Sequence, residues 1–123
     1  MRLFKVPLGL LCVLLATTAC NKNTAPPAAL TVEQLPAAFD KAFAKAKPEV
    51  RGMATEVISS VQAKAYAKAH SQIQMLATAS DLTKEQSSVV GRGMLTISSL
   101  MQAAAAQGDE NAAQAVKVYR SNK

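Results

Sequence analysis

The chain has 123 residues and a formal net charge of +6 at pH 7, and hydrophobic residue types make up 50% of it. This length suits one small domain. With one histidine and two cysteines in the whole sequence, we expect neither a metal site, which needs three or four ligands within reach, nor nucleophilic catalysis, which needs a base with an orienting group. We therefore predict a non-enzyme without a cofactor.

The first 19 residues have the layout of an export signal. Arg2 and Lys5 form a short positive start, and Leu8 to Leu15 is an uncharged apolar run. Even with its flanks, this run is too short for a membrane-spanning helix, which needs about 20 apolar residues. We therefore predict that residues 1–19 are a signal peptide and that the mature chain begins at Cys20.

The signal ends in LATTAC, residues 15–20, which resembles the lipobox of bacterial lipoproteins. Ala19 directly before Cys20 matches the lipobox, whereas Thr17 stands where that family usually has Leu. The resemblance implies that Cys20 carries lipid, such as palmitate, and anchors the protein to a membrane. Asn21, in place of Asp, implies an outer-membrane location facing the periplasm. The alternative is ordinary signal-peptidase cleavage after Ala19, which would release a soluble protein.

Removal of the signal leaves Cys20 as the only thiol, so the mature chain can form no internal disulfide. Lipidation explains such an unpaired cysteine in an oxidising compartment. Twelve Lys and Arg and eight Asp and Glu remain, a net charge of +4, which favours weak attraction to anionic surfaces over nucleic-acid binding. We expect residues 20–30 to be the lipidated cysteine and a flexible tether, and residues 31–123 to form a single domain.

Apolar residues at three- and four-residue spacing predict helices throughout this domain, and no window shows the alternation of a strand. Pro48 separates the first two helices, because a proline disfavours helical geometry at the residue before it and itself suits a first turn. Gly108 and Asp109 separate the last two helices as a C-terminal stop and an N-cap. The expected helices span about residues 32–47, 48–62, 66–79, 84–106 and 110–120.

The direction of the apolar face changes in the middle of the chain. At about 100° per residue, Val50 and Val57 share one face, whereas Tyr66 and Ile73 lie about 140° away from it. One straight helix cannot turn both faces toward a single core, so we predict a tight turn at Ala63 to Ala65.

The predicted fold class is all-α: a small bundle of about five short helices. Two antiparallel helical hairpins, residues 48–79 and 84–121, stack on each other and on an N-terminal helix.

The pentapeptides LTVEQ at 30–34 and LTKEQ at 82–86 are near copies of one another. In each, the threonine hydroxyl can accept from the backbone of the glutamine three residues later, whose side chain reaches back, which is a capping box. Two LTxxQ motifs in a small exported helical protein also resemble the periplasmic LTxxQ chaperones. That resemblance implies a holdase that binds unfolded clients, although thirty-seven residues follow the second motif here.

A second resemblance is to tetratricopeptide-type helical hairpins, through residues Tyr66, Ala69, Gly108, Asp109 and Ala113. It implies a shared hairpin architecture. The other signature positions of that family are missing from this chain.

Two lysine pairs occur in the related segments KAFAKAK and KAYAKAH. Lys41 with Lys45, and Lys64 with Lys68, stand four residues apart and so share a helix face. Such lysines usually form a solvated face, but these four are our candidates for contact with anionic lipid or polysaccharide.

The only histidine, His70, sits at the edge of an apolar face and is more typical of a partly buried structural histidine than of a ligand or base. The glycines of the GRG segment, residues 91–93, lack the preceding strand of a phosphate-binding loop, so we expect them to allow close helix packing or to soften the helix. We therefore predict a lipid-anchored cell-envelope module that binds a protein partner without catalysis. The alternatives are an LTxxQ-like holdase and a binder of anionic lipid or polysaccharide.

Overall fold

The computed structural model describes residues 27–122, so the predicted signal peptide, Cys20 and most of the predicted tether lie outside the described residues. Within them the chain forms five α-helices and no strand, which confirms the predicted all-α class. The helices are α1 (Gln34–Phe43), α2 (Pro48–Gln62), α3 (Tyr66–Ala77), α4 (Lys84–Ala106) and α5 (Glu110–Ser121).

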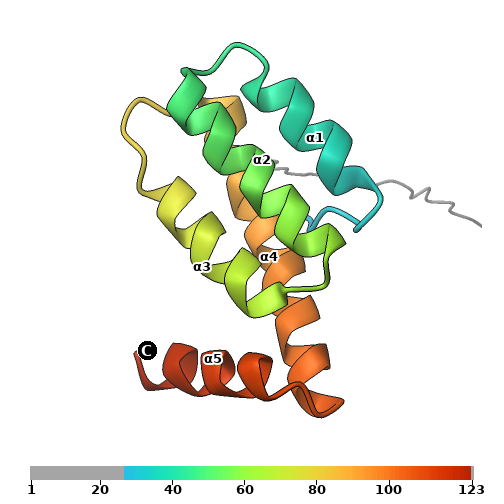
Figure 1. The fold of residues 1–123 in the computed structure, drawn as a ribbon. Coiled ribbons are helices and arrows are strands. Elements are labelled where there is room, and N and C mark those ends of the chain that lie inside the picture. The colour runs from blue at the N-terminus through green and yellow to red at the C-terminus, as the bar shows by residue number, and fades with distance from the viewer. Residues whose placement is uncertain (1–26, 123) are drawn as a thin grey trace, which may run out of the picture.

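The longest helix, α4, is the centre of the bundle and contacts α1, α3 and α5. Helices α2 and α3 form the predicted antiparallel hairpin, and α2 also packs against α1 (Figure 1). The final helix follows α4 through a short turn and contacts α4 and α3. Figure 1 shows that α5 lies across the end of the bundle instead of running back along α4. Helices α4 and α5 therefore do not run antiparallel along each other, and α5 lies beside the start of α3.

The reciprocal bonds of both predicted capping boxes are present, at the N-cap of α4 and, for Thr31 and Gln34, in the turn that leads into α1. At the start of α4, the Gln86 N–H donates to Thr83 Oγ1 at 3.0 Å, and the Thr83 N–H donates to Gln86 Oε1 at 2.9 Å. The equivalent bonds between Thr31 and Gln34 are 3.1 and 3.0 Å long. Each box satisfies two backbone donors that a helix start leaves unpaired. The helix-starting role predicted for the repeated pentapeptide is confirmed.

The regular part of α1 ends at Phe43, earlier than the predicted end at Lys47. Lys47 has ψ of 148°, which is extended, and Pro48 is the first residue of α2. The ring of Pro48 excludes the helical conformation from Lys47. The chain must also reverse direction before α2 can pack on α1, so the last residues before Lys47 form turns.

The predicted turn at Ala63 to Ala65 is confirmed. Lys64 adopts the left-handed conformation with φ of 61°. Its N–H donates to Val61 O at 3.0 Å, and the Ala65 N–H donates to Ser60 O at 2.8 Å. These two bonds are the Schellman pattern that usually has glycine at the left-handed position. A lysine there carries a steric penalty, because its Cβ crowds the following carbonyl.

The core is made where α1, α3 and α4 meet. A Cβ atom placed on Gly93 of α4 would lie 3.0 Å from Phe39 Cε1 and 3.3 Å from Ile73 Cδ1, both tighter than ordinary contact. Phe39 and Ile73 are essentially fully buried. Gly91 has open space around it. The prediction that the GRG glycines allow close helix packing is therefore confirmed for Gly93.

Two buried polar side chains of α4 form hydrogen bonds to the end of α1 and to the segment before it. Gln86, besides capping α4, donates from Nε2 to Ala42 O of α1 at 3.1 Å. In the segment before α1, Leu30 is buried, and its carbonyl oxygen accepts from the Thr96 hydroxyl of α4. Because a buried carbonyl without a donor is costly, these bonds fix both the end of α1 and the segment leading into it.

We predict opposite effects for alanine at the two glycines of α4. Gly91→Ala should stabilise the protein by about 1 kcal/mol, because alanine is the better helix former. Gly93→Ala gains the same propensity but pushes a methyl group into Phe39 and Ile73, and overpacking of this kind costs about 1–3 kcal/mol. In urea denaturation of the mature chain, Gly93→Ala should be less stable than Gly91→Ala by about 1–3 kcal/mol. Equal stabilities would contradict the close packing at Gly93.

We also predict that Lys64→Gly stabilises the protein by up to about 1 kcal/mol, because glycine adopts the left-handed conformation without the Cβ penalty. Lys64→Ala keeps the Cβ and removes only the charge, so its unfolding free energy should stay near that of the parent chain. A loss of about 1 kcal/mol in Lys64→Gly, the usual effect of glycine inside a helix, would instead indicate an unbroken rod.

Candidate functional site

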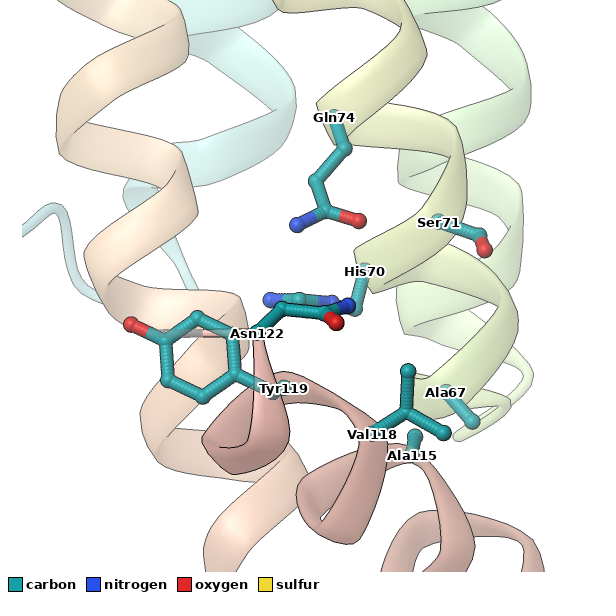
Figure 2. Close-up of a pocket in the computed structure, with 8 residues that line it drawn as sticks. All are labelled: Ala67, His70, Ser71, Gln74, Ala115, Val118, Tyr119 and Asn122. Atoms are coloured by element: carbon teal, nitrogen blue, oxygen red, sulfur yellow. The ribbon is translucent and has the colours of Figure 1, made fainter.

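A pocket of about 470 Å³ lies between α3 and α5 (Figure 2). Each helix supplies residues at positions i, i+3, i+4 and i+7, the spacing that places side chains on one helix face. This volume lies in the range of ligand pockets, about 300–1,000 Å³. We call it the α3–α5 groove, and it is lined by Ala67, His70, Ser71, Gln74, Ala115, Val118, Tyr119 and Asn122.

The α3–α5 groove exists because small side chains face each other where the two helices approach. Ala67 of α3 and Ala115 of α5 are half-buried and fill little of the space between the backbones. Polar rim residues Gln74 and Asn122 are exposed. Val118 leaves 57% of its surface exposed, although it is a large apolar side chain. The groove therefore combines an apolar floor with hydrogen-bonding groups and one exposed apolar contact at its rim.

His70 lies against α5 and is only 5% exposed, so the prediction of a partly buried histidine is confirmed. Its ring meets Tyr119 edge to face, with ring centroids 5.5 Å apart. Its Nε2 atom is buried and has no hydrogen-bond partner among the described residues. Burial disfavours the charged imidazolium and lowers the pKa of His70 below its ordinary value of 6.5. The side chain is thus neutral at pH 7.

The lining of the groove offers binding groups but no recognisable catalytic pair. It contains no Asp, Glu, Lys, Arg or Cys. A histidine acts as a general base most effectively when another group orients it, and no carboxylate lines the groove beside His70. Across residues 27–122, no group of three or more His, Cys, Asp or Glu side chains could hold a metal ion. The groove can therefore exclude water and form neutral hydrogen bonds.

The four lysines predicted to contact anionic surfaces do not form one patch. All four are exposed, and none makes an ion pair within the described residues. Lys41 and Lys45 lie by the end of α1, before α2 begins, whereas Lys64 and Lys68 follow the end of α2. The 15 residues of α2 therefore separate the pairs by about 20 Å at 1.5 Å per residue. A single small anion could therefore not contact both pairs.

Sequence reasoning missed most of the groove. The apolar stripe of α5 consists of Ala112, Val116 and Tyr119, and the first two are buried in a small cluster with Met101. Val118 lies outside that apolar stripe, and its exposure marks it as a contact residue only once the direction of α5 is known. The sequence signal that could have indicated the groove is the i, i+3, i+4, i+7 spacing of its lining residues, which begins at Ala67 in one helix and at Ala115 in the other.

No helix in residues 27–122 is long and apolar enough to span a bilayer. Comparison with protein families, curated proteins and solved structures found no significant match for this chain. The resemblances to lipoproteins, LTxxQ chaperones and tetratricopeptide hairpins thus remain predictions from their residues. Function must be argued from the α3–α5 groove itself, since a helical bundle alone does not define one.

Proposed function

We propose that the protein is a lipid-anchored, non-catalytic interaction module of the cell envelope that binds an uncharged segment of a protein partner in the α3–α5 groove. The observation that carries this proposal is the groove itself, with its uncharged lining and its exposed apolar rim residue Val118. Burying a charge against such a lining would cost several kcal/mol, on the order of the penalty for an unpaired ion. An uncharged segment avoids that cost.

The lining also suits a peptide in its hydrogen-bonding chemistry. Gln74 and Asn122 each carry an amide that can both donate and accept, which matches the N–H and C=O of an extended chain. The space above Ala67 and Ala115 can take an apolar side chain of the partner. Met75, the neighbour of Gln74, is 60% exposed and adds apolar surface near the same end of α3. Adaptable Met side chains are common at binding surfaces.

The envelope location rests on the export signal and the lipobox-like sequence before Cys20. An anchor there would hold the domain at the periplasmic face of the outer membrane, where its partner would be an envelope protein. The holdase alternative draws less support, because capping bonds account for the threonines and glutamines of both LTxxQ copies. The anionic-surface alternative draws less support because the lysine pairs stand apart.

The anchor predicts a membrane-bound protein with a modified Cys20. Mass spectrometry of the N-terminal peptide from the exported protein should find lipid on Cys20, and Cys20→Ser should move the protein from the membrane to the soluble fraction. Asn21→Gln keeps the cysteine and should remain in the membrane fraction. An unmodified Cys20 in a soluble exported protein would contradict the anchor and favour ordinary signal-peptidase cleavage.

The groove predicts that a charge at its rim removes partner binding without unfolding the domain. Val118→Asp places a carboxylate at the groove, and because Val118 is 57% exposed, the folded domain should tolerate it. In affinity purification from solubilised envelope of the producing bacterium, a protein retained by the parent chain should be lost with Val118→Asp.

Leu95 supplies the matched control, since it is 49% exposed on α4 and does not line the groove. Leu95→Asp adds the same charge and should retain the partner. Equal recovery with both variants would contradict binding at the groove. Suppression of aggregation of an unfolded test protein by the parent chain and by both variants would favour the holdase alternative.

A further inference from the structure

The attachment of α5 to the bundle is small. Of its 12 residues, Ala112 and Val116 are the buried ones, and they form a separate cluster with Met101 of α4. Helix α1, with 10 residues, buries four residues in the main core, two of them phenylalanines. Because free energy of local opening follows the apolar area that must be exposed, α5 should detach at lower free energy than any part of the main core.

The segment before α5 can act as a hinge. Gly108 has φ of 99° and open space around the position of a Cβ atom. The bonds at this turn include those from the Gly108 N–H to Ala105 O at 3.2 Å and from the Asp109 N–H to Ala104 O at 3.0 Å, and Asp109 Oδ1 accepts from the Ala112 N–H. Gln107, Gly108 and Asp109 are all exposed. A change in backbone angles here would swing α5 away from α3 and from Met101 of α4 while the main core stays in place.

Docked α5 keeps His70 in a position that disfavours the charged imidazolium. Tyr119 of α5 covers the ring edge to face, and Nε2 has no hydrogen-bond partner within the described chain. A protonated imidazole carries two N–H donors, and a buried charge without partners costs much more than a buried neutral group. Protonation therefore favours any conformation in which water reaches this ring.

Within the described chain, no charged side chain lines the groove beside His70. Among the residues lining the groove with His70, Tyr119 of α5 is the only other titratable one, whereas Tyr66 and Lys68 of α3 do not line it. Burial is the cause of the lowered pKa of His70. The nearest charges along these two helices, Lys68 and Arg120, are cations and would oppose a second positive charge.

We infer that protonation of His70 releases α5 from α3 through the Gly108 hinge, so that mild acid dismantles the α3–α5 groove. The effect on partner binding rests on the function proposed above, whereas the release of α5 does not. The direction of the pH effect follows from linkage. In the open form, with His70 in water, its pKa stays near the ordinary value of 6.5, whereas burial in the closed form lowers it. The open population therefore grows as the pH falls below that value.

Hydrogen exchange of the mature chain tests this inference. Between pH 7.5 and 5, and after correction for the intrinsic exchange rate, amides of α5 should open more often, approaching about 30-fold at pH 5 if the closed form stays unprotonated. Amides of α2 should change much less, because α2 packs in the main core and not in the small cluster beneath α5. His70→Phe keeps an aromatic ring against Tyr119 and cannot titrate, so its α5 should show no acid response. His70→Gln, which is polar and also does not titrate, provides the same comparison if the Phe variant fails to fold.

Two results would overturn the inference: equal acid responses in α5 and α2, which mean global unfolding, or an acid response of α5 that persists without His70. Partner capture at pH 5 and 7.5 separates the two proposals. Acid release of α5 with undiminished capture would leave the inference standing and contradict the groove as the partner site. If α5 stays closed at pH 5 and Val118→Asp still loses the partner, the inference about His70 is contradicted and the groove stands as the partner site.

Discussion

The approach of two helices to the backbone of α4 at Gly93 constrains the whole bundle. Phe39 of α1 and Ile73 of α3 both reach the place where any other residue would carry a side chain. This contact brings α1 and α3 onto α4 at one level, and α2 then packs against both α1 and α3. Because interiors are close-packed, a methyl group at this position would disturb three helices together.

The position of α5 follows from this packing. The main core is closed by α1 to α4, and the C-terminal part of α4 extends beyond it to Met101 and the small cluster with Ala112 and Val116. Helix α5 covers that end and lies against the start of α3 (Figure 1). The same arrangement leaves the α3–α5 groove open, exposes Val118 and places His70, whose Nε2 atom has no hydrogen-bond partner in the described chain, against α5.

Features set by local physics could be predicted from the sequence, and those set by the direction of a helix could not. The capping boxes at Thr31 and Thr83 and the stop at Gly108 involve residues within a few positions of one another. The turn at Lys64 followed from the change of apolar face, even though no glycine marks it. The groove depends instead on α5 crossing the bundle, which is decided by long-range packing on Met101. The separation of the two lysine pairs follows from the length of α2, which the sequence does predict.

The close approach at Gly93 is tested most directly by NMR of the mature chain in solution. The account predicts strong nuclear Overhauser cross-peaks from the Gly93 α-protons to the Phe39 ring and to the Ile73 δ-methyl group, with an upfield ring-current shift of one α-proton. Cross-peaks to neither side chain, or to only one of them, would contradict the three-helix contact and the arrangement of α1, α3 and α4 built on it.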